Sequence, residues 1–138
     1  MKLNSNNRES PTQGKLSGPL LDRIDLHIEV PGVSAQQLLE AAAGEASATI
    51  RGRAVAARER ALARQGGPNQ ALAGAEIDRH AALAPAALQF LQLAATRLGW
   101  SARSTHRALK VARTIADLES SRRVRHHHVA ESLLYRQD

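Results

Sequence analysis

Only one segment of this chain has the alternation of a β-strand, and this limits the folds that the chain can adopt. Apolar and polar side chains alternate from Ile24 to Val30, and Pro31 and Gly32 end the segment. A lone strand cannot satisfy its backbone hydrogen bonds, so we expect its partner strands to lie outside this chain. We therefore predict an all-α helical bundle of about four to five helices, with at most one isolated strand near residues 24–30.

The remainder of the chain from Ser34 onward has helical patterning. Ser34 and Gln37 resemble a capping box that opens a short helix ending near residue 43. Ser47 is predicted to cap a longer helix to about Gln65, which the Gly-Gly-Pro-Asn sequence at 66–69 ends. Further helices are predicted at 74–83, 85–98, 101–118 and 127–135. For four of these helices we also predict the stripe of residues that faces the core. These stripes are Ile50, Ala54, Ala57 and Ala61 in the helix from Ser47; Leu88, Leu91, Ala95 and Leu98 in the helix at 85–98; Ala108, Val111, Ile115 and Leu118 in the helix at 101–118; and Val129, Ala130, Leu133 and Leu134 in the helix at 127–135.

The apolar content predicts a thin core. Hydrophobic residues make up 43% of the chain but aromatic residues only 2%, and much of the apolar content is alanine, which favours helix but buries little surface. We expect closely packed helices that are stabilised by contacts with another domain. The net charge of +6 suits a phosphate-rich partner, although arginine in place of lysine on solvated faces explains it equally well.

The ends and bulk composition place the chain in the cytoplasm. Residues 1–17 are polar and are interpreted as a disordered linker, or as residues foreign to the protein. No apolar run is long enough to span a bilayer, and the N-terminus lacks a signal peptide. With 0 cysteines, the chain has neither disulfides nor thiolate metal sites. We expect no membrane partner.

Two arginine-containing motifs carry the functional information. The first is GPLLDRIDLHIEVP at residues 18–31, where Arg23 stands at the entrance of the predicted strand. The second is RLGWSARSTHRALKVARTIADL at residues 97–118, where Arg103 and Arg107 lie four residues apart and share one helix face. Locally, Arg23 pairing with Asp22 or Asp25 is the simpler interpretation. A solvent-exposed helix face explains the spacing of Arg103 and Arg107 as well as phosphate binding does.

Both motifs resemble those of magnesium-chelatase-like AAA+ ATPases of the ComM type. The resemblance extends over about residues 15–136, and residues 56–66 and 128–136 contribute to it. It implies that residues 18–33 end an AAA+ core and that residues 34–138 form the helical C-terminal lid domain. By the same resemblance, Arg23 is an arginine finger toward the nucleotide of a neighbouring subunit. Arg103, with Arg107 as its alternative or support, is the sensor-2 residue at the nucleotide's terminal phosphate.

The resemblance also implies partners and cofactors. They are the AAA+ core of the same polypeptide, neighbouring subunits of a homo-oligomeric, hexameric ring, and DNA on which the ring performs helicase-like branch migration. ATP and Mg²⁺ would belong to the full-length parent. The chain itself lacks a phosphate-binding loop of the Gly-x-x-x-x-Gly-Lys-Ser/Thr type, so we expect this fragment alone to bind no nucleotide and to be non-catalytic.

Two other functions fit the local patterns. Residues 86–118 have the outline of a helix-turn-helix, with Arg103, Arg107 and Lys110 facing a DNA groove. A purely structural oligomerisation domain is the third hypothesis, although the small apolar side chains argue against a large hydrophobic interface.

Three consecutive histidines, His126, His127 and His128, raise the question of a metal site. Consecutive helical residues point in different directions and rarely converge on one ion. We therefore predict structural or surface roles for them, and no metal site.

Overall fold

The computed structural model describes residues 18–21 and 23–136, and this part of the chain is helical. The predicted linker at 1–17 lies outside the described residues. The helices are α1 (Gly18–Leu21), α2 (Ala35–Glu40), α3 (Ser47–Gln65), the 3-10 helix η2 (Asn69–Ala71), α4 (Ala75–Ala81), α5 (Pro85–Leu98), α6 (Ala102–Leu118) and α7 (His126–Leu134). The all-α prediction is confirmed.

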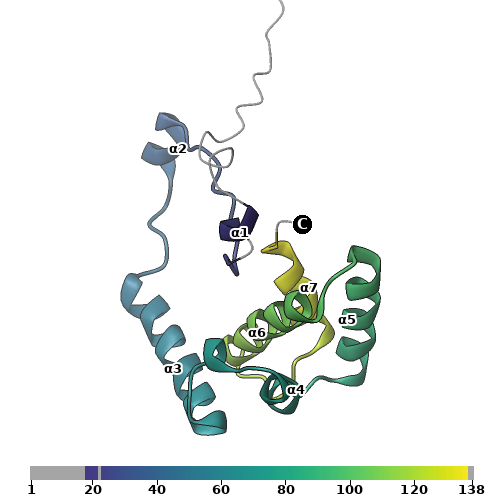
Figure 1. The fold of residues 1–138 in the computed structure, drawn as a ribbon. Helices are drawn as coiled ribbons and strands as arrows, with labels where there is room; N and C mark the ends of the chain where they lie inside the picture. Colours follow the sequence, from purple (N-terminus) through teal and green to yellow (C-terminus); the bar gives the residue numbers. More distant parts are fainter. Residues whose placement is uncertain (1–17, 22, 137–138) are drawn as a thin grey trace, which may run out of the picture.

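Helix α6 lies at the centre of the bundle (Figure 1). It packs against α3, α4, η2 and α7, and α5 reaches the bundle through α7. One short contact with β geometry ties the loops together, because Leu83 and Val124 form a parallel bridge. None of the helices among the described residues has the length and apolar character needed to cross a bilayer.

Local sequence signals define most helix ends. The capping box of Ser34 and Gln37 is present at the start of α2, and the Ser101 hydroxyl caps α6 by accepting the Ser104 N–H. Gly66 adopts a left-handed conformation with φ of 75° directly after α3, as the break predicts. The prediction for Ser47 is wrong by one residue, since Ala46 is the N-cap and supplies no side-chain hydrogen bond.

The core consists of small and medium aliphatic side chains from η2 to α7. Phe90 and Trp100 pack against its edge without being fully buried. The buried set is Leu72, Ile77, Ala81, Ala87, Leu91, Leu109, Ala112, Ala116, Val124 and Val129. The prediction of a thin, alanine-rich core agrees with this set.

The buried faces of α5 and α7 differ from the predicted stripes. In α5, Ala87 and Leu91 are buried, whereas Leu88 and Leu98 are exposed. The predicted face and the observed face both have the residue spacing of a helix. The observed face contains Ala87, whose methyl side chain permits a closer approach between helices. In α7, Leu134 is exposed, and the buried residues are His128, Val129 and Ser132.

The predicted stripe of α6 is also incomplete. Val111 and Ile115 are only partly buried and Leu118 is exposed. Because four other elements contact α6, burial extends around the helix beyond one stripe. Its buried residues are Ala108, Leu109, Ala112, Arg113, Ala116 and Asp117.

A buried charge network joins α3 and η2 to the C-terminal end of α6. The Asp117 carboxylate accepts hydrogen bonds from Arg64 at 2.8 and 3.0 Å, from the Asn69 amide at 2.9 Å and from Arg113 at 3.1 Å. The side chains of Arg113 and Asp117 are 1% and 2% exposed. A charge buried this deeply requires a partner, so the two residues depend on each other.

Arg113 also holds the loop that follows α6. Its guanidinium donates to the carbonyl oxygens of Ala81, Ser121 and Arg122 at 3.1, 2.6 and 2.9 Å. Its Nε has no hydrogen-bond partner among the described residues. One arginine therefore links α4, α6 and the loop before α7.

The pKa of Asp117 reflects this network. Burial by itself would raise the pKa, but hydrogen bonds from Arg64 and Asn69 and the charges of Arg113 and Arg64 outweigh it, so the pKa is lowered. The carboxylate is therefore charged in the folded protein at neutral pH.

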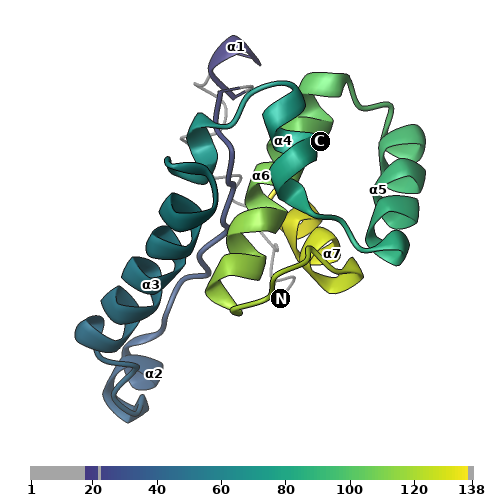
Figure 2. The ribbon, with the colours of Figure 1, turned by 90° about the horizontal axis from the view of Figure 1, so that it is seen from below.

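The segment between α1 and α2 does not form a strand. Ile28 and Val30 are 69% and 81% exposed. The recorded backbone contact of this segment with the bundle is the His27 N–H donating to the Tyr135 carbonyl at 2.7 Å. Both views place α2 apart from the helices α4 to α7 (Figures 1 and 2). The alternation at residues 24–30 is thus present without the strand pairing that would bury it.

We predict that Asp117→Asn destabilises the domain by about 3 kcal/mol, because it leaves buried Arg113 without its counter-charge. The measurement is the free energy of unfolding from urea denaturation at pH 7. A loss similar to that of an average surface substitution would contradict the proposed dependence of Arg113 on Asp117.

The matched control is Glu45→Gln, which removes an exposed carboxylate that pairs with Arg53. Solvent screens this pair, so we expect no measurable change in unfolding.

Candidate functional site: a basic cleft beside helix α6

An open cleft of about 580 Å³ lies beside the N-terminal half of α6. Leu72, Ala73, Gly74 and Ile77, from η2 to α4, line one side of it, and α6 lines the other. The segment that follows α1 contributes Arg23 and Asp25, which are distant in sequence from every other lining residue.

All three arginines predicted from the sequence line this cleft. Arg23 arrives from the loop after α1, where its backbone N–H donates to the Leu20 carbonyl at 3.0 Å. Arg103 and Arg107 arrive from successive turns of α6. The structure therefore brings together residues that the sequence separates by about 80 positions.

The start of α6 places its cations on one face. The Ser101 cap fixes the first turn, and the spacing of Arg103, Arg107 and Lys110 by four and three residues keeps them adjacent. Lys110 Nζ donates to the Gln70 carbonyl at 3.0 Å, which joins α6 to η2. Arg103 is exposed, and the described residues contain no recorded ion pair for it.

Asp25 holds Arg107. Its Oδ1 accepts a hydrogen bond from Arg107 Nε at 2.8 Å, and the Arg107 side chain is 14% exposed whereas that of Asp25 is 60% exposed. Local spacing suggests Asp22 or Asp25 as the partner of Arg23. The structure instead pairs Asp25 with an arginine 82 residues away, a relationship that local spacing does not reveal.

The charges that line the cleft favour an anion. Among the described residues, Arg23, Arg103, Arg107 and Lys110 line the cleft together with one carboxylate, that of Asp25. His106 also lines the cleft, 3.9 Å from the Asp78 carboxylate. Guanidinium groups present paired donors to phosphate oxygens, so the arrangement suits a ligand with several phosphates.

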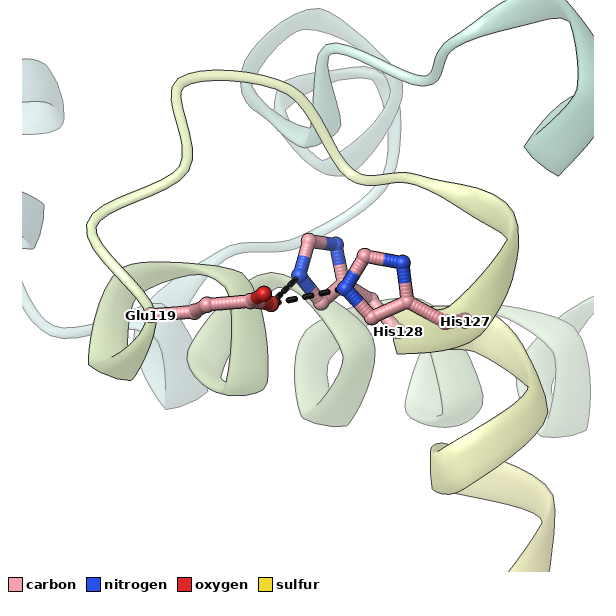
Figure 3. Close-up of side chains that lie close together, drawn as sticks. All are labelled: Glu119, His127 and His128. Carbon is pink, nitrogen blue, oxygen red and sulfur yellow. Dashed lines mark hydrogen bonds and ion pairs between the residues drawn. The ribbon is translucent and has the colours of Figure 1, made fainter.

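A second cluster of polar side chains lies at the other end of α6. Figure 3 shows Glu119 directed at the imidazoles of His127 and His128. Glu119 Oε2 interacts with Nε2 of both histidines, at 2.8 Å for His127. These three ligand atoms lie within 4.8 Å of one another, close enough to surround a metal ion.

The second ring nitrogen of His128 argues against metal binding at this cluster. His128 Nδ1 accepts the backbone N–H of Arg125 at 2.8 Å, which caps the start of α7. An accepting Nδ1 carries no proton, so Nε2 carries it and donates to Glu119. A metal ion would need a lone pair at that same Nε2. We therefore interpret the cluster as a structural link between α6 and α7. His127 and His128 are consecutive, yet both reach Glu119, which differs from the diverging directions expected from the sequence.

Sequence comparisons agree with the resemblance of the two motifs. Residues 44–136 match the family described as magnesium chelatase, subunit ChlI C-terminal, and residues 3–38 match the family described as magnesium chelatase, subunit ChlI. The similarity thus extends to residue 3, and the prediction that it starts only at about residue 15 is wrong.

Several curated proteins are similar over nearly the whole chain. Competence protein ComM of Haemophilus influenzae is 42% identical over 138 residues, and the uncharacterized protein YifB is 40% identical in Salmonella typhimurium and 38% in Escherichia coli, each over 141 residues. Each alignment covers 96% of this chain and 27% of the relative. The chain therefore spans about a quarter of the length of these relatives.

We predict a pH dependence of stability that originates at Glu119. Hydrogen bonds from His127 and His128 lower the pKa of Glu119 below its ordinary 4.5. The resulting stabilisation is complete above pH 4.5 and is lost as the pH falls through the lower pKa of the folded state. Melting temperatures of the unchanged chain and of Glu119→Gln, measured from pH 3 to 7, should converge at the acidic end.

Glu59→Gln is the control, because Glu59 is exposed on α3 and has no recorded ion pair among the described residues. Its melting temperature should follow that of the unchanged chain across the pH range. A constant difference between Glu119→Gln and the unchanged chain at every pH would contradict the prediction.

Proposed function

The chain belongs to the magnesium chelatase ChlI C-terminal family, and on this premise we propose that it is the lid domain of an AAA+ ATPase whose arginines contact the phosphates of ATP. The ATP and Mg²⁺ would be held by an AAA+ core elsewhere in the longer polypeptide. The lid would supply positive charge at the terminal phosphate, where charge develops during transfer.

One observation carries this proposal: Arg23, Arg103 and Arg107 line the same cleft. Arg103 and Arg107 come from one motif and share a helix face, but Arg23 comes from a separate motif about 80 residues away, and nothing in the sequence requires that it meet them. Their convergence beside Lys110, with Asp25 as the one carboxylate from the described part of the chain that lines the cleft, supports a shared phosphate ligand.

The shared cleft also changes which nucleotide Arg103 would contact. The resemblance alone implies that Arg23 reaches the neighbouring subunit and that Arg103 folds over its own nucleotide. Because both line one cleft, we propose that both act on the nucleotide of the neighbouring subunit. The lid would then couple two subunits of a homo-oligomeric ring, hexameric by the same resemblance.

The work done by such a ring is inferred from the resemblance. We propose ATP-driven, helicase-like action on DNA in the cytoplasm, with the net charge of +6 in its support. The helix-turn-helix alternative is less well supported, because α6 would be its recognition helix. That helix packs against four elements of its own domain, which leaves little of its surface for a DNA groove.

We predict that Arg103→Ala lowers ATP turnover of the full-length ring by about a hundredfold, the usual effect of losing one preorganised donor. Arg103→Lys should restore little, because lysine lacks the planar fork. Steady-state phosphate release is the measurement. Arg58→Ala, on an exposed position of α3, is the matched control and should leave turnover unchanged.

Mixed rings test whether the two arginines act on one nucleotide. If both act across the interface, rings mixed from Arg23→Ala and Arg103→Ala subunits stay inactive, because neither subunit presents both arginines. If Arg103 acts on its own nucleotide, some interfaces in mixed rings regain both residues and turnover recovers. Recovery would therefore contradict the shared site.

A further inference from the structure

We propose that Asp25 is a positioning residue that orients the Arg107 guanidinium toward the phosphates of the ligand. This inference rests on the proposed function of the basic cleft and assigns a role to the one carboxylate that the described residues contribute to its lining. Asp25 itself would not touch the reacting atoms.

The geometry of the ion pair supports this role. Asp25 accepts from the Nε of Arg107, and the structure records no other hydrogen bond of Arg107 within the described residues. A guanidinium has five N–H donors in a rigid fork, so a bond at Nε fixes the plane of the group while its Nη donors remain available. Phosphate binds such a pre-oriented edge with two parallel hydrogen bonds.

Arg107 and Asp25 are buried to different extents, and this difference indicates which residue is held and which one holds it. The Arg107 side chain is 14% exposed and that of Asp25 is 60% exposed. The Arg107 side chain is thus largely enclosed, whereas the Asp25 carboxylate is open to solvent. Fixing an arginine before binding reduces the side-chain entropy that binding costs.

The same contact fixes a second arginine. Asp25 lies two residues from Arg23, and His27, two residues further, donates its N–H to the Tyr135 carbonyl. These two contacts, on both sides of Leu26, hold the segment directly after Arg23 on the bundle. Loss of the Asp25 bond would therefore loosen Arg23 as well as Arg107.

A simple electrostatic role predicts the opposite behaviour. A carboxylate beside four cations weakens anion binding, so its removal would strengthen binding if charge were its only contribution. If Asp25 positions Arg107, its removal weakens binding in spite of the gain in positive charge. The sign of the change therefore separates the two roles.

The experiment titrates the 138-residue chain with inorganic tripolyphosphate, by calorimetry and by NMR of the arginine Nε–H signals. Low ionic strength is used so that the cations of the cleft bind this small anion even though the fragment alone is not expected to hold a nucleotide. We expect Asp25→Asn to weaken binding about three- to fivefold, near the upper end of what a partly exposed ion pair contributes. The Arg107 Nε–H signal should move even without ligand. Asp25→Glu should restore both the affinity and the signal.

The matched control is Glu29→Gln, which removes the same charge from the same segment at an exposed position outside the cleft. It should bind tripolyphosphate as well as, or slightly more tightly than, the unchanged chain. Unchanged or tighter binding by Asp25→Asn overturns the positioning role of Asp25, whereas the proposed function stands if Arg103→Ala still weakens binding. If the unchanged chain and Arg103→Ala bind equally or not at all, the phosphate role of the cleft fails, and the inference about Asp25 fails with it.

Discussion

The arrangement of the bundle depends on the ion pairs and hydrogen bonds of the Asp117 carboxylate. This carboxylate accepts hydrogen bonds from both Arg113 and Arg64 in an interior with few large apolar side chains. Arg113 in turn holds the carbonyls of Ala81, Ser121 and Arg122, so that one charge group orders α3, α4 and the loop before α7 around α6. Such a network is stable only when complete, since an unpartnered buried charge is costly.

Helix α6 connects this network to the basic cleft. Asp117 lies in its last turn, whereas Arg103 and Arg107 lie in its first two. A continuous α-helix transmits position along its axis with little bending, so the packing at one end determines where the arginines at the other end stand. The cleft is thus built mainly on a rigid element. Arg23 and Asp25, by contrast, belong to a loop that two hydrogen bonds, at Asp25 and at His27, attach to the bundle.

Local signals predicted the helices well, and long-range polar contacts poorly. Ser34, Gly66 and Ser101 determine helix ends through their own backbone and side-chain chemistry, so they are recognisable in a sequence. Arg113 and Asp117 at an i, i+4 spacing resemble an ordinary solvated pair, and nothing local indicates that they are buried. The pairing of Asp25 with Arg107 spans 82 positions and needs the fold. The site arginines were predicted from motif resemblance, and their common cleft became apparent only in three dimensions.

The alanines at the helix contacts have a mechanical consequence. Ala87, Ala112 and Ala116 are fully buried, and a methyl group has no rotamers through which a core can rearrange. Helices that meet through such residues slide past one another less readily than helices that meet through flexible leucine or methionine. A load applied at one edge of the bundle would therefore displace it as a solid block, with little of the work dissipated in internal rearrangement.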